Sequence, residues 1–229
     1  MRIAFFDFDK TLLRIDSGRA VAWPMFRRGL VPPGPAARFG WNGLLYLAGL
    51  KSRSTMQRIG YATYAGLTLE LLVPLMKDLW TEALEPILSG PMIERLAEHR
   101  AAGDCVVLLT ASPAFVAHPA RDALGLDGVE GTRMAVGDDG RLTGEPASPP
   151  LEGREKAKRA AHWAERRGVT AAECIAYTDS IVDLPLLDWV GTPVAVGPDR
   201  ELAEVARARG WEVVRHAPRG LSRGESSAP

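Results

Sequence analysis

Short apolar runs recur along the chain, and helix-like segments separate them. The runs are four or five residues long and lie at 3–6, 105–109, 174–177, 193–196 and 211–214. Such runs without polar alternation are typical of strands that are buried on both faces. Helical patterns lie at 91–103, 153–168 and 199–210, the last with Asp199 as its expected N-cap. This alternation predicts an α/β fold with a Rossmann-like, three-layer parallel sheet.

Residues 16–90 interrupt the alternation, because they contain helical patterns and no convincing strand. A crossover between parallel strands normally needs a single helix. We therefore predict a helical cap at 16–90, inserted after the first strand, and a catalytic core formed by 1–15 and 91–216. Further helices packed directly on the core are the alternative. An Asp-Gly turn at 139–140 predicts a hairpin within 132–144, and the small polar residues of 217–229 predict a flexible tail.

The overall charge balance argues against a polyanionic partner. The 229 residues include 28 Lys and Arg and 28 Asp and Glu, whereas nucleic acids and anionic membranes select a basic excess. Two cysteines in a chain of this length predict a reducing compartment, so we expect a cytoplasmic protein. The apolar segment 39–50 is shorter than the roughly 18 residues of a spanning helix. We do not expect membrane association, but association through this segment is kept as an alternative.

Polar side chains follow three of the predicted strands and begin one of the helices. In an open parallel sheet, ligands bind beyond the carboxyl ends of the strands. Each residue alone has an ordinary explanation, such as a helix cap or a solvated lysine. Together they place carboxylates, hydroxyls and one ammonium at a single rim, which packing does not explain; they are Asp7, Asp9, Thr110, Ser112, Lys156, Asp179 and Asp183.

A cluster of carboxylates at one rim points to a cation and to phosphate chemistry. Mg²⁺ binds one or two carboxylates together with substrate phosphate, which would relieve the repulsion among the aspartates. A carboxylate can also act as a nucleophile toward phosphorus. Asp7 and Asp9 are two residues apart, so in an extended segment both carboxylates address the same side.

The order of these segments resembles the haloacid dehalogenase superfamily, in particular its phosphoserine-phosphatase-like subgroup, subfamily IB. The four matching motifs are DFDKT at 7–11, LLTAS at 108–112, Lys156 within EGREKAKR, and TDSIVD at 178–183. The resemblance covers the core from Arg2 to about Arg215, whereas the cap matches only in size and position. It implies the fold of that superfamily, a Mg²⁺ cofactor and a small-molecule phosphomonoester substrate.

The resemblance also implies a role for each motif residue. Asp7 would be the nucleophile that forms a phospho-aspartate, and Asp9 would be the general acid and base. Asp7, the main-chain carbonyl of Asp9, and Asp179 would hold the metal. Thr110 and Lys156 would hold the phosphoryl group, and Asp183 would orient Lys156 or a metal-bound water. Independently of the resemblance, we expect Ser112 to be a second hydrogen-bond donor to phosphate, and the spacing predicts that Lys10 faces elsewhere.

The second aspartate of the first motif separates a phosphatase from a dehalogenase. A leaving alkoxide needs a proton and a leaving halide does not, so the presence of Asp9 favours phosphatase chemistry. A phosphotransferase would use the same residues and differ only in excluding water. A non-catalytic binding protein with this fold is the alternative from another class. The chain is expected to be a monomer or a homodimer.

The cap is expected to recognise the leaving group. Asp16 stands where the resemblance implies an acid that grips the substrate amino acid, and an N-cap of the first cap helix is its other interpretation. The expected cap arginine falls on Gly60, with Arg58 and Arg53 nearby, which puts phosphoserine in question. Histidinol phosphate, a phosphocholine-like ester or a lipid phosphate are the alternative substrates. His118 and His162 are expected in surface or packing positions.

Overall fold

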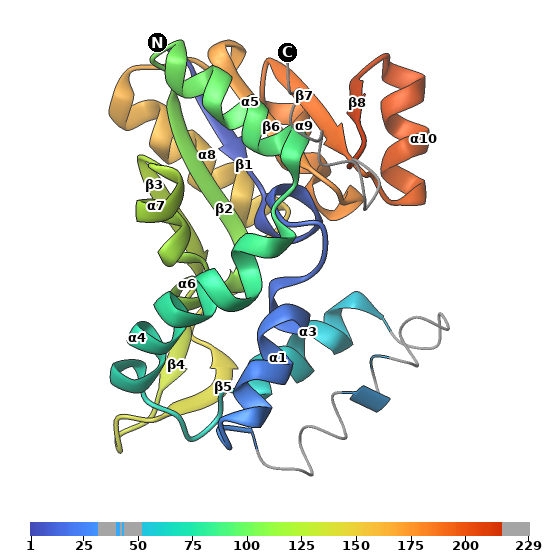
Figure 1. Ribbon diagram of the computed structural model, residues 1–229. Coiled ribbons are helices and arrows are strands. Elements are labelled where there is room, and N and C mark those ends of the chain that lie inside the picture. The colour runs from blue at the N-terminus through green and yellow to red at the C-terminus, as the bar shows by residue number, and fades with distance from the viewer. Residues whose placement is uncertain (32–39, 42, 44–51, 217–229) are drawn as a thin grey trace, which may run out of the picture.

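The computed structural model describes residues 1–31, 40, 41, 43 and 52–216. Within these ranges one sheet holds six parallel strands in the order β3-β2-β1-β6-β7-β8 (Figure 1). The predicted α/β fold is thereby confirmed. The predicted tail at 217–229 and most of the apolar segment 39–50 lie outside the described residues. The strands are β1 (Ile3–Phe6), β2 (Cys105–Pro113), β3 (Gly128–Thr132), β6 (Cys174–Thr178), β7 (Thr192–Val196) and β8 (Glu212–Val214).

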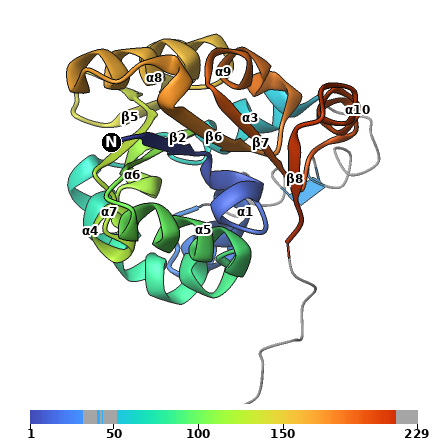
Figure 2. The ribbon, with the colours of Figure 1, turned by 90° about the horizontal axis from the view of Figure 1, so that it is seen from above.

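Both faces of the sheet are covered, which explains why its central strand is apolar throughout. In β1, Ile3 and Phe5 join one core cluster, and Ala4 and Phe6 join the other. Figure 2 shows α8 and α9 on one side of the sheet and α5 and α7 on the other. The helices are α5 (Gly90–Ala101), α6 (Ala114–Ala117), α7 (Pro119–Leu124), α8 (Arg154–Arg167), α9 (Leu184–Trp189) and α10 (Arg200–Arg209).

The segment between β1 and β2 is helical in its described part, as predicted. It contains α1 (Ser17–Arg27), α3 (Arg53–Ala62), α4 (Leu69–Leu79) and two short helical turns, Trp80–Leu84 and Glu85–Ile87. Figure 1 shows these helices beyond the carboxyl ends of β1 and β2. Because one apolar cluster runs from Phe6 in the sheet to Leu72 in α4, this region packs directly on the core. Its division from the core as a cap domain at 16–90 stays a prediction.

A hairpin from the second half of the chain extends the helical region. β4 (Met134–Val136) and β5 (Leu142–Pro146) pair in antiparallel fashion at the predicted place. The N–H of Gly66 donates to the carbonyl of Leu142 at 2.8 Å, and the N–H of Leu142 donates to the carbonyl of Leu67 at 2.8 Å. The hairpin therefore ties the segment after α3 to the part of the chain that follows β3.

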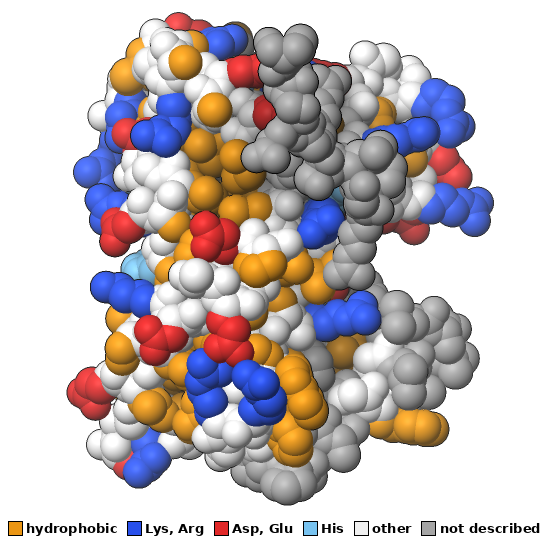
Figure 3. Space-filling model, viewed as in Figure 1, with side chains coloured by type: hydrophobic (Ala, Val, Ile, Leu, Met, Phe, Trp, Pro, Cys, Tyr) orange, Lys and Arg blue, Asp and Glu red, His pale blue; other side chains and the backbone are white. Residues whose placement is uncertain are grey.

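The described surface carries mixed charge. On the face in Figure 3, acidic and basic side chains alternate over the described residues without a continuous basic area. Among those residues, no helix has the length and apolar character needed to cross a bilayer. Cys105 and Cys174 are both free and buried.

Candidate active site

Three neighbouring strands bring their carboxyl ends to one edge of the sheet. Phe6 in β1 pairs with Leu108 in β2 and with Tyr177 in β6. The next residue, Asp7, donates its N–H to the carbonyl of Tyr177 at 2.9 Å. Asp7 therefore lies level with the end of β6 and beside the last part of β2, where Thr110 is fully buried.

A buried lysine lies between two of the predicted aspartates. The Nζ of Lys156 is 2.8 Å from Asp7 Oδ1 and 2.7 Å from Asp183 Oδ2. The side chain of Lys156 is 1% exposed and that of Asp183 is 1% exposed, so solvent screens neither contact. A charge in such a place must be paired, because burying an unpaired ammonium is costly. Residues 7, 156 and 183 thus form one buried ion cluster.

Gly153 explains how Lys156 reaches the rim. Its N–H donates to Asp183 Oδ1 at 2.8 Å, and its φ of 52° lies in the left-handed region. A Cβ at this position would lie 2.8 Å from the carbonyl oxygen of Val182, closer than side chains allow. Glycine therefore lets α8 begin directly against the loop after β6, which brings its first turn over Asp7.

The cluster shifts the ionisation of all three groups. Burial raises the pKa of Asp7 to about 6, and the Lys156 ammonium opposes this shift. Burial disfavours the charged lysine, but Asp183 and Asp7 outweigh it and raise the pKa of Lys156. Burial likewise disfavours the charged form of Asp183, yet contact with Lys156 holds its pKa below the usual range. At neutral pH the cluster is one cation between two carboxylates.

Thr178 joins this cluster and was not among the predicted site residues. Its Oγ1 donates to Asp183 Oδ2 at 2.9 Å and lies 3.5 Å from Asp7 Oδ2. The predicted strand ended at residue 177, one residue too early, because a threonine at a strand end is commonly a loop residue. The pairing of β6 with β7 extends through Thr178 and so aims its hydroxyl at the aspartates.

The carboxylate of Asp9 is held from two sides. Its Oδ1 accepts the N–H of Ser17 at the start of α1 at 2.5 Å, and its Oδ2 accepts the hydroxyl of Ser112 at 2.5 Å. The two serine hydroxyls are 3.0 Å apart. Burial raises the pKa of Asp9, and the hydrogen bonds from Ser112 and Ser17 oppose the shift. The sequence placed Ser112 at the phosphate, whereas its hydroxyl contacts Asp9, and Ser17 was not predicted.

The predicted metal ligands can be tested by their chemistry. Among the described residues, no three His, Cys, Asp or Glu side chains group as a metal site. The predicted set needs only two carboxylates, from Asp7 and Asp179, with the main-chain carbonyl of Asp9. Asp7 and Asp179 are 5% and 6% exposed and follow adjacent parallel strands. Two hard oxygen anions at one edge fit Mg²⁺, which keeps several water ligands.

The two residues expected to grip an amino acid are not part of the buried ion cluster, although the charge of Asp16 adds to the raised pKa of Asp9. Asp16 precedes α1 in the N-cap position without a capping side-chain bond, and its Oδ1 is 3.2 Å from the Nζ of Lys10. Lys10 was expected to face away from the two aspartates of its motif, and its ammonium pairs with Asp16. Arg58 is exposed on α3 and forms no ion pair with the described residues. The side chain of Arg53 lies outside the described residues.

Two buried tyrosines, one in α3 and one two residues after its end, face the core. The hydroxyl of Tyr61 donates to the carbonyl of Ala111 at 2.6 Å, next to Thr110 in β2. Tyr64 packs edge-on against Phe115 with ring centroids 5.0 Å apart. Burial raises the pKa of Tyr64, and the nearby Asp9 carboxylate adds to the shift. Both side chains are 3% exposed, so they pack in the interior of the protein next to the site.

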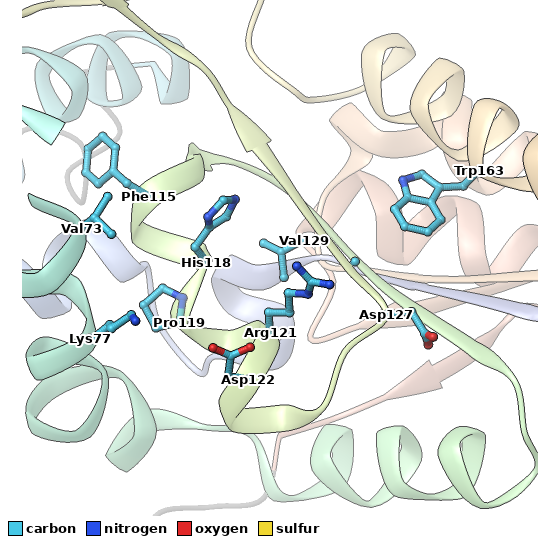
Figure 4. Close-up of a pocket in the computed structure, with 11 residues that line it drawn as sticks. Val73, Lys77, Phe115, His118, Pro119, Arg121, Asp122, Asp127, Val129 and Trp163 are labelled. Carbon is cyan, nitrogen blue, oxygen red and sulfur yellow. The ribbon is translucent and has the colours of Figure 1, made fainter. Parts of the chain in front are cut away.

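A separate pocket of about 400 Å³ lies beside the edge strand β3 (Figure 4). No residue predicted for catalysis lines it. Its lining mixes acidic and basic side chains with a histidine and apolar groups, among them Lys77, Arg121, Asp122, Asp127, His118 and Trp163. The ion cluster at the strand ends is therefore the candidate active site, and this pocket is distinct from it.

Comparison with known families identifies the fold and the class of enzyme. Residues 4–188 match the family described as haloacid dehalogenase-like hydrolase. This chain belongs to that family. The relatives of this hydrolase include proteins named as phosphatases, which assigns it to the phosphoric monoester hydrolases.

Three curated relatives align with nearly the whole of this hydrolase. The "inhibition of morphological differentiation protein" of Streptomyces azureus is 34% identical and covers 92% of this chain and 77% of its own length. Histidinol-phosphatase of Neisseria meningitidis serogroup C is 32% identical, and the alignment covers 93% of this chain and 97% of the relative. Phosphoserine phosphatase SerB1 of Mycobacterium tuberculosis is 34% identical, and the alignment covers 92% of this chain and 69% of the relative.

Solved structures confirm the family fold. A protein of unknown function from Bordetella pertussis Tohama I superposes with a TM-score of 0.79, is 30% identical, and covers 93% of this chain and 98% of its own. A phospho-aspartyl intermediate analogue of phosphoserine phosphatase superposes with a TM-score of 0.68 and 18% identity. The match covers 94% of this chain and 93% of that structure. At that identity the second match shows the fold alone.

Proposed function

We propose that this hydrolase cleaves phosphate monoesters of small organic alcohols and that Asp7 is its nucleophile. The observation that carries the proposal is the buried contact of Lys156 with Asp7 and Asp183 at 2.8 and 2.7 Å. A fixed ammonium beside the attacking carboxylate stabilises the negative charge that gathers on the transferring phosphoryl group. Asp183 holds the lysine in place, which supports a positioning role for Asp183 in place of direct substrate binding.

In the first step, a carboxylate oxygen of Asp7 attacks phosphorus while the bond from phosphorus to the alcohol oxygen breaks. The product is a phospho-aspartate, and the carboxyl of Asp9 gives its proton to the leaving alkoxide. The raised pKa of Asp9 supports this role, because it favours a proton that can be donated.

In the second step, water attacks phosphorus and the phospho-aspartate bond breaks. The carboxylate of Asp9 accepts a proton from that water, which releases inorganic phosphate and restores Asp7. Thr110 supports both steps in this proposal. Its Oγ1 accepts the N–H of Ser112 at 3.0 Å, so its own hydroxyl hydrogen is available to a phosphoryl oxygen.

Magnesium fits the carboxylates of this site. We propose that Asp7, Asp179 and the main-chain carbonyl of Asp9 hold it. The ion would supply positive charge to the phosphoryl oxygens, in addition to the charge of Lys156. Two carboxylates at one rim are the donor set that Mg²⁺ shares with a phosphate ligand.

We propose a leaving group that is larger than serine, with histidinol phosphate as the first ester to test. Among the described residues, Asp16 is paired with Lys10 and Arg58 is exposed, so neither is arranged to grip an amino acid at the rim. The relative named histidinol-phosphatase, which aligns over 97% of its length, supports this choice.

The test is phosphate release from a panel of esters by the purified chain. The panel contains histidinol phosphate, phosphoserine, phosphocholine and a short-chain lipid phosphate, each with Mg²⁺ and with excess chelator. We expect release that needs the metal and that is fastest with histidinol phosphate, and Asp7→Asn gives the background. Fastest release from phosphoserine would contradict the proposed substrate class, and no release from any ester would contradict the proposed function.

A further inference from the structure

His216 joins two segments that flank the active site. It follows β8, and its Nε2 lies 2.9 Å from the carbonyl oxygen of Lys10. Its Nδ1 lies 2.8 Å from Ser89 Oγ. A carbonyl can only accept, so Nε2 carries the hydrogen, and in the neutral ring Nδ1 accepts the hydroxyl hydrogen of Ser89. One imidazole thus links the C-terminal segment to two residues far earlier in the chain, Lys10 and Ser89.

The first contact falls on a strained point of the catalytic loop. Lys10 has a φ of 55° and is the only residue other than glycine with positive φ among those the structure describes. A left-handed conformation costs a residue with a Cβ about 1–2 kcal/mol, so surrounding contacts must hold it. The residue immediately before it is Asp9. The hydrogen bond from His216 therefore fixes the Lys10–Thr11 peptide unit, which begins one residue after the proposed acid and base.

The second contact falls on the two chain segments, here called linkers, that connect the sheet with α1–α4. The N–H of Arg14 donates to the carbonyl of Ile87 at 2.8 Å, and the N–H of Ser89 donates to the carbonyl of Leu12 at 2.8 Å. The outgoing and returning linkers therefore run side by side. Ser89 is 1% exposed and ends the returning linker just before α5. His216 contacts this pair at the end nearest the sheet.

Gly197 makes room for the ring. It follows β7 with a φ of 48°, and its N–H donates to the carbonyl of Val214 at 2.8 Å. A Cβ at this position would lie 3.1 Å from ring atoms of His216. The family match ends at residue 188, so both Gly197 and His216 lie beyond the matched residues.

We propose that His216 is a positioning residue for Asp9. It holds the Lys10 peptide and the Ser89 end of the linkers in the arrangement from which Asp9 transfers its proton. This inference rests on the proposed function for the role of Asp9, but the contact itself involves none of the proposed ligands or nucleophile. Loss of the imidazole is expected to slow the proton-transfer steps and to leave binding of the ester almost unchanged.

The test compares His216→Ala with His216→Gln and with His162→Ala, an exposed histidine of α8. The amide N–H of glutamine can still donate to the Lys10 carbonyl. We expect kcat to fall about tenfold in His216→Ala, in keeping with the loss of one to two hydrogen bonds, with KM changed by less than about twofold. His216→Gln should recover most of this loss, and His162→Ala should match the wild type.

Amide hydrogen exchange gives a second measurement that does not need activity. In His216→Ala, peptides that cover 8–13 and 87–90 should exchange faster, whereas peptides from β2 and β6 should be unchanged. Equal kcat in His216→Ala and His162→Ala, or a uniform rise in exchange across the whole chain, would overturn the proposal. If the wild type releases no phosphate from any ester, the proposed function fails, and unchanged exchange at 8–13 would then also reject the contact.

Discussion

The two sides of the active site are built in different ways. On the sheet side, Asp7, Lys156 and Asp183 form direct contacts of 2.7–2.8 Å and are buried. On the side of the helical region, Asp16 and Arg58 lie in partly or fully exposed positions. Strand ends in a parallel sheet have a common edge whatever the side chains are, whereas residues on a helix reach a site only if the helix docks with that face inward. The sheet side should therefore be sensitive to substitution, and the helical side tolerant at these two positions.

The largest effect is expected for Lys156→Ala. Removing the ammonium leaves Asp7 and Asp183 buried and facing each other without a cation, so we expect a loss of about 3–5 kcal/mol in stability. Turnover should fall by at least about 10²- to 10³-fold. Urea unfolding and steady-state kinetics measure the two effects. Lys158→Ala is the matched control, because Lys158 is exposed and, among the described residues, its ion pair is with Glu155 in α8. Equal behaviour of both variants would contradict a buried ion cluster.

A network at the opposite end of the sheet should affect stability without affecting turnover. Asp104 contacts buried His99 at 2.8 Å and Arg2 at 2.8 Å. Burial disfavours its charged form, but the hydrogen bonds from His99 and Arg2 lower the pKa of Asp104. The carboxylate therefore stabilises the fold above its unfolded pKa of about 3.9, and this contribution is lost as pH falls through the lower folded pKa.

We therefore expect Asp104→Asn to lower the free energy of unfolding by about 1–3 kcal/mol at pH 7. The difference from the wild type should shrink in unfolding curves recorded below about pH 4, while kcat at pH 7 stays unchanged. Asp138→Asn, at an exposed position in the hairpin turn, is the control. A difference between wild type and Asp104→Asn that is the same at every pH would rule out the charged network.

A smaller effect is expected where the two sides meet. Ser112→Ala removes the hydroxyl that donates to Asp9 Oδ2 at 2.5 Å, while the bond from the Ser17 N–H remains. Because a hydrogen bond to a charged group contributes about 1.5–3 kcal/mol, kcat should fall at least about tenfold. If Ser112 instead binds the phosphate, as its sequence position suggested, KM would rise and kcat would change little.

The smallest effect is expected for Arg58→Ala. An exposed arginine without an ion pair to the described residues should change kcat/KM for histidinol phosphate by less than about twofold. The same measurement with phosphoserine sharpens the comparison. A tenfold or greater loss with phosphoserine alone would restore the amino-acid grip that the family resemblance implied.

The strands and their terminal residues could be predicted because the signal is local. The apolar run of β1 ends at Phe6, and Asp7 follows it, as the sequence indicates. β3 could not be predicted in the same way, since its sequence GVEGT contains two glycines and it lies at the edge of the sheet. Helices α6, α7 and α9 are only four to six residues long, which is too short for a periodic pattern.

Several contacts of the site could not be predicted because they join residues far apart in the chain. Ser17 and Ser112 are 95 positions apart, and no spacing rule relates them. Tyr64 follows the end of α3, so its position near Asp9 depends on how that helix docks. Two other residues of the site stand close to predicted site residues in the sequence. Thr178 stands directly before the predicted metal ligand Asp179, and Gly153 stands three residues before Lys156.

The central claim is that Asp7 takes the phosphoryl group, and rapid quenching tests it most directly. Excess chain with Mg²⁺ is mixed with a ³²P-labelled ester and quenched in acid over a series of times. We predict label that is attached transiently to the peptide containing Asp7, is released by hydroxylamine as an acyl phosphate, and is absent in Asp7→Asn. Release of phosphate by Asp7→Asn at the wild-type rate, with no labelled peptide at any time, would contradict the account.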